Sequence, residues 1–284
     1  MLDLLQITND PVFARRCDAL SGGAGRMRLF VDLERLGKAE RQAGRNTFIS
    51  AHQVSDVGYI KAQLKHSQLM VRVNPVNPAT KSEVNAVFAQ GLAATDLLML
   101  PMFTSAAELR HFSAIVAGRC PIVALLETAG ALATLDDWLA TPGLSEVFVG
   151  LNDLHLSLGL RFMFEPLANG IVDRVAAAAH RQGLRFGCGG IARLDEGLLP
   201  GRDVLAEHLR LGSQAVILSR TFNRTDGSGS AVTSFEDEVL ALREAEAQLE
   251  QRTAVQVEAD RVRIAARIMA IAQGVAIPKG VARP

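Results

Sequence analysis

The chain has 284 residues, and 49% of them are hydrophobic. Its 30 Lys and Arg residues equal its 30 Asp and Glu residues, so the formal net charge is +0. This balance does not imply the broad electropositive surface of a nucleic-acid-binding protein, and small molecules are the expected partners. The length is compatible with two small domains or with one large domain, such as an α/β barrel of about 250 residues.

Cysteine content and the N-terminal sequence indicate where the protein resides. The three cysteines are widely spaced and odd in number, which fits neither a disulfide framework nor a Cys-x-x-Cys zinc site. The N-terminal segment lacks the basic region of a secretory signal, and no apolar run approaches the length of a membrane span. We therefore expect a soluble, cytoplasmic protein with no membrane partner.

Short apolar runs alternate with longer segments of helical periodicity. The runs cover residues 4–8, 28–33, 69–73, 97–100, 122–126, 146–149, 185–187 and 215–219. Such alternation predicts a parallel sheet whose strands are buried on both faces. Eight strands favour a closed (β/α)₈ TIM barrel over residues 1–224, with an open doubly wound sheet as the alternative. No glycine-rich dinucleotide or phosphate-loop motif follows a run, which weakens that alternative.

The remaining residues, 225–284, form a predicted linker and helical extension. Residues 225–234 are small, polar and glycine-rich, which is typical of a mobile loop or linker. Residues 235–272 form a long, charged, heptad-like helical segment with an apolar face. This segment either covers its own barrel or packs on a neighbouring subunit, and we expect a homo-oligomer.

Two carboxylates stand at the ends of consecutive predicted strands. Glu127 follows residues 122–126, and Asp153 lies just past residues 146–149. The ends of parallel strands share one face, so these side chains present oxygen ligands suited to a hard cation such as Mg²⁺ or Mn²⁺. A lone acid more often caps a helix or pairs with an arginine. Repetition at the same position of two consecutive units instead predicts a metal site.

Motifs at several strand ends resemble one protein family. They are F-V-D-L-E at 30–34, V-R-V-N-P at 71–75, L-M-L-P-M at 98–102, E-T-A at 127–129 and G-L-N-D-L at 150–154. Across roughly residues 28–220 the chain resembles the HpcH/HpaI family of citrate lyase beta subunits and class II pyruvate-type aldolases. The resemblance implies a modified TIM barrel that binds Mg²⁺ or Mn²⁺. It also implies enolate chemistry on 2-oxo acids, oxaloacetate or acyl-CoA esters, usually in an oligomer.

The resemblance assigns roles to the strand-end residues. Glu127 and Asp153 match the metal-binding carboxylates, and Arg72 matches the arginine that holds the substrate carboxylate or enolate oxygen. A planar, permanently charged guanidinium suits that role because it can bind two oxygens and stabilise developing negative charge. A structural salt bridge is the alternative for Arg72. Asp32 and Glu34 match the element that orders metal-bound water and acid-base groups.

The turn before Asp153 is a further candidate for substrate binding. Its residues are Gly150, Leu151 and Asn152, whose backbone N–H groups could bind a carboxylate. Gly150 is equally explained as a residue that lets the chain turn.

The sequence departs from the family directly after Glu34. The aldolases carry a histidine there, whereas this chain has Arg35, which cannot act as a base near neutral pH. We interpret Arg35 as a contact for an additional anionic group on the substrate. Lys38, Arg41 and Arg45 lie nearby, and a solvated helix face explains them equally well. His52 ends another apolar segment and is the candidate replacement acid-base group.

The loops after the seventh and eighth strands offer a possible phosphate site. In barrels these loops often bind phosphate, and glycines allow backbone amides to approach an anion. Tight turns without a ligand explain them at least as well. The residues concerned are Gly189, Gly190, Arg193, Ser219 and Arg220.

Together these residues predict a metal-dependent carbon–carbon lyase or aldolase. The expected substrate is a 2-oxo acid of the pyruvate or oxaloacetate type, which would react through a metal-stabilised enolate. An acyl-CoA lyase of the citrate lyase beta type is the first alternative. A non-catalytic ligand-binding barrel, with Arg35 as the sign of lost activity, is the second.

Overall fold

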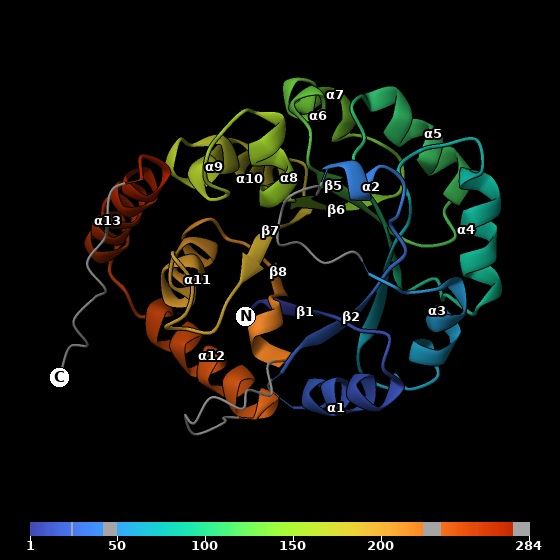
Figure 1. Cartoon of the computed structure of the whole chain (residues 1–284), viewed down its shortest axis with the longest axis horizontal. Helices are drawn as coiled ribbons and strands as arrows, with labels where there is room; N and C mark the ends of the chain where they lie inside the picture. The colour runs from blue at the N-terminus through green and yellow to red at the C-terminus, as the bar shows by residue number, and fades with distance from the viewer. Residues whose placement is uncertain (24, 42–49, 224–233, 275–284) are drawn as a thin grey trace.

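The computed structural model describes residues 1–23, 25–41, 50–223 and 234–274. Its strands form one closed barrel in sequence order, with every neighbouring pair parallel and β8 paired with β1 (Figure 1). The TIM barrel expected from the sequence is confirmed. The strands are β1 (Asp3–Ile7), β2 (Met27–Asp32), β3 (Gln68–Arg72), β4 (Leu97–Leu100), β5 (Ile122–Leu126), β6 (Leu144–Val149), β7 (Arg185–Ile191) and β8 (Ala215–Leu218).

Helices connect the strands and surround the barrel (Figure 1). A short 3₁₀ helix, η1 (Arg220–Asn223), follows β8. The α-helices are α1 (Pro11–Ser21), α2 (Lys38–Arg41), α3 (Val54–Lys61), α4 (Thr80–Ala89), α5 (Ala106–Val116), α6 (Ala129–Ala133), α7 (Leu135–Trp138), α8 (Leu151–Ser157), α9 (Glu165–Ala168), α10 (Ile171–Arg181), α11 (Gly201–Arg210), α12 (Phe235–Glu250) and α13 (Ala254–Ala272).

Strand β7 runs four residues further than the sequence indicated. The strand was expected to end at Gly187, and Gly189 and Gly190 were compatible with a tight turn, yet the strand continues to Ile191. A Cβ at Gly187 would lie 2.7 Å from the Phe148 ring, so glycine serves here to admit a neighbouring side chain. The pairing register with β8 shifts between Gly187 and Gly190. This glycine-rich sequence is therefore a strand under close packing.

Alternation along the strands fills the barrel interior. The inward residues form one buried apolar cluster of Leu5, Phe30, Met70, Leu97, Met99, Val123, Leu125, Phe148 and Ala215. The intervening residues, such as Leu29 and Val31 of β2, pack in the cluster between the barrel and its helices. Because side chains repeat every second residue, positions two beyond inward residues also point into the barrel at its C-terminal end.

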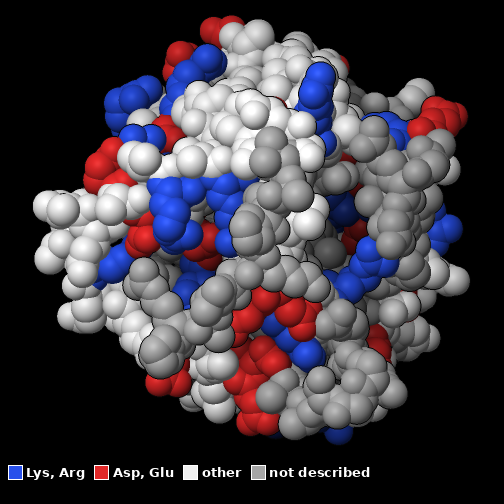
Figure 2. All heavy atoms as spheres, turned by 60° about the vertical axis from the view of Figure 1, so that its left-hand side comes forward, with Lys and Arg blue, Asp and Glu red and all other residues white. Residues whose placement is uncertain are grey.

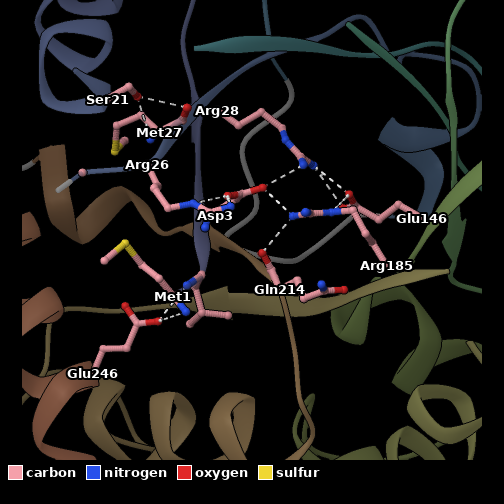
Figure 3. Close-up of polar contacts among 12 residues, drawn as sticks. Met1, Asp3, Ser21, Arg26, Met27, Arg28, Glu146, Arg185, Gln214 and Glu246 are labelled. Atoms are coloured by element: carbon pink, nitrogen blue, oxygen red, sulfur yellow. Dashed lines mark hydrogen bonds and ion pairs between the residues drawn. The ribbon is translucent and has the colours of Figure 1, made fainter. Parts of the chain in front are cut away.

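Ion pairs close the opposite, N-terminal end of the barrel. Arg28 of β2 reaches Asp3 of β1 at 3.0 Å and Glu146 of β6 at 3.0 Å (Figure 3). Arg185 of β7 bonds the same two carboxylates, and its Nε lies 3.3 Å from Glu146. The Glu146 side chain is 0% exposed. Four strands are thus joined through charges that neutralise one another away from water.

The expected helical segment 235–272 consists of two helices. Helix α12 ends at Glu250, and Thr253 starts α13 by accepting a hydrogen bond from the Gln256 N–H. This N-cap divides the segment because a capping residue has non-helical backbone angles. Helix α12 packs against α11, and α13 packs against α9 and α11.

Helix α12 is bonded to the start of its own barrel. The Leu2 N–H donates to Glu246 at 2.7 Å, and Arg243 donates to the Leu2 carbonyl at 2.7 Å. These contacts hold the extension against its own chain. Helix α13 leaves Val255, Val262 and Met269 exposed at intervals of seven residues. Association with a second copy stays a prediction.

Charges of both signs cover the side formed by α11, α12 and α13. Figure 2 brings this side forward and shows Lys and Arg side chains interspersed with Asp and Glu side chains. One such pair joins Arg263 to Asp260 at 3.0 Å. No described helix combines the length and apolar composition needed to span a membrane. Arg45 and residues 225–233 of the expected linker lie outside the described ranges.

The ion pairs at the barrel base generate a stability prediction. Glu146→Gln leaves Arg28 and Arg185 with Asp3 as their shared carboxylate and so leaves a positive charge uncompensated, and we expect the free energy of unfolding to fall by about 3 kcal/mol. Chemical denaturation measures it. The control, Glu258→Gln, removes an exposed pair on α13 and should leave the midpoint near that of the wild type. Equal midpoints for all three proteins would contradict a structural role for the base charges.

Candidate active site

A cavity of about 540 Å³ opens at the C-terminal ends of the strands. It brings together most of the residues singled out from the sequence, although they are distant along the chain. Among those lining it are Asp32, His52, Arg72, Glu127, Gly150, Leu151, Asn152 and Asp153. Asp32, Arg72 and Glu127 lie two residues beyond Phe30, Met70 and Leu125. The strand alternation therefore directs these three side chains inward.

Asp32 holds Arg72 in a fixed orientation. Arg72 Nε donates to Asp32 Oδ1 at 2.9 Å, and Nη2 donates to Oδ2 at 2.8 Å. Burial opposes ionisation of Asp32, but the nearby positive charges of Arg72 and Lys38 outweigh it and hold the pKa of this carboxyl well below its usual range. Arg72 thus makes with Asp32 the bidentate contact that was expected with the substrate. Nη1 of Arg72 lies 4.0 Å from Glu127.

Lys38 is a cavity residue that the sequence did not distinguish from a solvated helix face. Its side chain is buried, and Nζ lies 2.8 Å from Asp32 Oδ2 and 3.3 Å from Glu34 Oε2. Arg41 extends this network by contacting Glu34 and by placing its Nε 3.8 Å from Asp153 Oδ1. The spacing of four residues from Glu34 to Lys38 was the available signal. Glu34 itself does not line the cavity.

Glu127 is the carboxyl group that the surrounding protein leaves incompletely paired. It is 3% exposed, and its Oε2 atom is buried without a hydrogen-bond partner. Burial raises its pKa to about 8, the charges of Glu34 and Asp153 add to this effect, and Arg72 opposes it. Such a group gains stability from a cation placed beside it.

Acidic and basic groups of the described residues lie close together at the site. The carboxyl groups are Asp32, Glu34, Glu127 and Asp153, and Lys38, Arg41 and Arg72 are in contact with them. The raised pKa identifies Glu127 as the acid whose anionic form the surrounding protein stabilises least. A cation held beside Glu127 and Asp153 would stabilise that anionic form.

The donor set fits a hard cation that keeps several outer ligands. Within the described ranges, no group of three or more His, Cys, Asp or Glu side chains is arranged to hold a metal ion. Two carboxylates would leave other coordination positions for water or substrate oxygens, as is usual for Mg²⁺. The unpartnered Glu127 oxygen supports such a site, because a buried polar atom normally has a partner.

Gly150 makes room for Glu127. A Cβ at this position would lie 2.5 Å from Glu127 Cγ and 2.7 Å from its Oε1. Its φ of −81° is open to other residues, so the side-chain clash explains the glycine. The Gly150 N–H donates to the Leu126 carbonyl at 3.0 Å. Leu151 and Asn152 lie in the first turn of α8, and binding of a substrate carboxylate by their amides stays a prediction.

His52 is placed as a hydrogen-bond donor. Its Nδ1 accepts the backbone N–H of Asp32 at 3.0 Å, so Nε2 carries the proton of the neutral ring. Burial lowers the pKa of His52, although the charge of Asp32 opposes this shift. A ring in this state cannot accept a proton at Nε2. This geometry favours a proton donor at Nε2, and the role of His52 as the replacement acid-base group stays a prediction.

Arg35 does not line the cavity. Its Nη2 donates to the His52 carbonyl at 2.8 Å, and its backbone N–H donates to Asn74 Oδ1 at 2.8 Å. It lines a separate hollow of about 270 Å³ on the other side of His52. The proposed contact between Arg35 and a substrate anion in the main cavity is therefore not supported by its position.

The loops after β7 and β8 contribute part of the expected phosphate site. Gly189, Gly190, Ser219 and Arg220 line the cavity. Arg193 does not line it, and its Nε lies 3.6 Å from Glu238 Oε1 of α12. The five residues therefore do not form one site.

Residues 28–186 match the model of the HpcH/HpaI aldolase/citrate lyase family, which is more than half of the chain. The chain belongs to this family. The resemblance drawn from the strand-end motifs is confirmed. The match covers β2 to β6 and therefore both Glu127 and Asp153.

Two curated relatives match shorter stretches of the chain. The hydroxypyruvate/pyruvate aldolase of Rhizorhabdus wittichii is 35% identical over 79 residues, which cover 25% of this chain and 32% of that protein. The (3S)-malyl-CoA thioesterase of Cereibacter sphaeroides is 32% identical over 107 residues, covering 38% of this chain and 36% of that protein. The chain thus matches about a third of the length of each relative.

The barrel is also similar to solved structures of the HpcH/HpaI family. One is the citrate lyase beta subunit from M. tuberculosis complexed with oxaloacetate and magnesium. The two chains share 17% identity with a TM-score of 0.54, over 86% of this chain and 96% of the other. At this identity the likeness supports the fold.

The close approach of Gly150 and Glu127 can be tested by mutation. Gly150→Ala should displace the Glu127 carboxylate from its buried position and lower the free energy of unfolding by about 1–3 kcal/mol. Thermal unfolding and a crystal structure of the variant measure both effects. Gly190→Ala is the matched control, because its added Cβ would lie no closer than 3.4 Å to the Ile217 carbonyl. An unmoved Glu127 in Gly150→Ala would contradict this account.

Proposed function

We propose that the protein is a divalent-metal-dependent carbon–carbon lyase or aldolase that acts on a 2-oxo acid through an enolate. The observation that carries this proposal is the incompletely paired Glu127 carboxyl beside Asp153 and Arg72 at the barrel mouth. Active sites of TIM barrels lie at this end. The aldolase match and the family's oxaloacetate and magnesium complex support the substrate class and the cofactor.

Glu127 and Asp153 would hold Mg²⁺ or Mn²⁺ in this reaction. When bound, the cation supplies positive charge that polarises the 2-oxo group and lowers the energy of the enolate. Glu127 directly follows β5, and Asp153 lies in the first turn of α8, which follows the adjacent strand β6. Water and substrate oxygens would complete the coordination.

Arg72 would stabilise the negative charge of the enolate from the other side. Asp32 accepts hydrogen bonds from Nε and Nη2 of Arg72. The remaining nitrogen, Nη1, faces Glu127 and would contact the substrate. Asp32 and Glu34 act as positioning residues because they hold Arg72, Lys38 and Arg41. A charge fixed before the reaction stabilises the transition state without reorganisation.

Cleavage of an acyl-CoA thioester is the second candidate. The match to a (3S)-malyl-CoA thioesterase favours it and covers more of this chain than the aldolase match does. Both reactions need stabilisation of negative charge on an oxygen, so the same three residues would serve either.

Proton exchange on pyruvate tests the enolate without a second substrate. In D₂O with Mg²⁺, we expect deuterium to enter the C3 position of pyruvate. Arg72→Lys should slow this exchange by about a hundredfold, because an ammonium group lacks the separate nitrogens with which Arg72 binds Asp32 and would contact the substrate. Proton NMR follows the exchange. Arg193→Lys, which changes an arginine outside the cavity, is the control. Exchange at the wild-type rate in Arg72→Lys would remove Arg72 from the proposed mechanism.

Metal binding should release a proton from Glu127. Its pKa of about 8 keeps it mostly protonated at pH 7, whereas a metal ligand must be ionised. Mg²⁺ binding should therefore release about one proton at pH 7 and almost none at pH 9.5, and apparent affinity should rise with pH up to that pKa. Calorimetry in buffers of different ionisation enthalpy measures the release. Glu127→Gln should show none, and equal release at both pH values would contradict the assignment.

A further inference from the structure

One half of the cavity is mainly apolar, with Arg220 as a charged side chain at its rim, and the proposed chemistry does not use it. The other charged side chains of the described lining lie at or after the ends of β2, β3, β5 and β6. Facing them, Ile7 of β1 and Ile217 of β8 are partly buried members of the barrel's apolar cluster and line the cavity. Leu125 and Phe148 lie one layer below the charged residues and form an apolar floor, and Met163 adds a further apolar contact.

Leu151 packs against the end of β7 in this half. Gly189 of β7 has a φ of +52°, and a Cβ there would lie 2.6 Å from Leu151 Cδ1. Both the backbone angle and the packing of Leu151 require glycine. The wall from β7 through β8 to β1 therefore presents Leu151 and two isoleucines to the cavity.

Two polar groups at the rim of this half have partners in the protein, whereas Oε1 of Gln6, which also lines the cavity, is buried without one. The Ser219 hydroxyl bonds the Thr221 hydroxyl at 2.9 Å. The Asn9 amide donates to Asp56 at 3.3 Å. Arg220 also lies at the rim, so an anionic substrate end held there is the competing possibility that a test must separate.

The size of the cavity exceeds that of a small 2-oxo acid. Cavities of about 300–1,000 Å³ hold molecules far larger than pyruvate. A 2-oxo acid bound by Glu127, Asp153 and Arg72 would leave the volume beside Ile7 and Ile217 to water or to the rest of the substrate. Water gains few hydrogen bonds against an apolar wall, so an apolar group is favoured there.

We propose that the part of the substrate beyond the 2-oxo acid head is an uncharged, mainly apolar group that binds against Ile7, Ile217 and Phe148. This inference rests on the proposed function, because the head is placed by Glu127, Asp153 and Arg72. It assigns the protein to long-chain or aryl substrates in preference to dicarboxylates and polyhydroxylated compounds.

Binding of a matched series of 2-oxo acids in the presence of Mg²⁺ tests this assignment. From pyruvate to 2-oxohexanoate, Kd measured by calorimetry should fall by about fourfold for each added CH₂ group. 2-Oxoadipate has the same six carbons as 2-oxohexanoate but ends in a carboxylate. It should bind at least about tenfold more weakly than 2-oxohexanoate, because a charge against an apolar wall loses hydration.

Variants of Ile217 locate the effect. Ile217→Asn should leave the Kd of pyruvate unchanged and abolish the gain per CH₂ group, whereas Ile217→Val should retain most of that gain. Thermal unfolding of both variants checks that the barrel is intact. If Ile217→Asn does not fold, Ile7→Thr on the neighbouring strand serves the same purpose.

The outcomes separate this inference from the proposed function. Pyruvate that binds and exchanges its C3 protons, without any effect of chain length, would overturn the apolar assignment and leave the enolate chemistry in place. Tighter binding of 2-oxoadipate than of 2-oxohexanoate would also overturn it and assign the rim at Arg220 to an anion. Absence of binding for every 2-oxo acid would overturn both.

Discussion

The two-residue alternation of the parallel strands is the constraint on which the site depends. In a closed barrel every second side chain must point inward, and the apolar cluster fixes which set does so. Phe30, Met70 and Leu125 belong to that cluster. The residues two positions later are Asp32, Arg72 and Glu127, so the packing that stabilises the barrel also directs the charged groups to one point. A shift of one residue in any strand would turn its charged group toward the helices.

The two ends of the barrel differ in how completely their buried charges are paired. At the N-terminal end, Arg28 and Arg185 share two carboxylates at hydrogen-bonding distance, and the charges largely cancel (Figure 3). At the C-terminal end, Glu127 keeps an unpartnered oxygen and a raised pKa. Such an arrangement is costly in the absence of a ligand. The N-terminal end is thus held together by its ion pairs, whereas the C-terminal end has a carboxyl group that a bound cation would stabilise.

The departure from the family pattern after Glu34 changes which residues supply the charges around Asp32 and Glu34. The position that carries histidine in the aldolases holds Arg35, and its side chain bonds a backbone carbonyl outside the main cavity. Lys38, three residues later, lies inside and contacts both Asp32 and Glu34. The second positive charge of the network therefore comes from Lys38. His52 is fixed by the Asp32 N–H, which leaves its Nε2 as a hydrogen-bond donor.

Much of the fold followed from local patterns. Eight apolar runs separated by helical segments predicted the barrel because each strand of a parallel sheet must be apolar on both faces. The ends of those runs also identified Asp32, Arg72, Glu127 and Asp153, since strand ends in such a fold share one face. The predicted length of the glycine-rich strand β7 was too short. Its glycines are required by the close packing of Phe148 and Leu151, which are distant in sequence.

The sequence by itself determined the barrel, the family and the set of strand-end residues, because these depend on periodicity and on motifs within single strands. Only the tertiary structure decided how those residues are paired. Arg72 is bound to Asp32, Lys38 is buried while Arg35 lies outside the cavity, and Gly150 gives space to Glu127. These pairings depend on distances between side chains from different strands and loops, which no local pattern encodes.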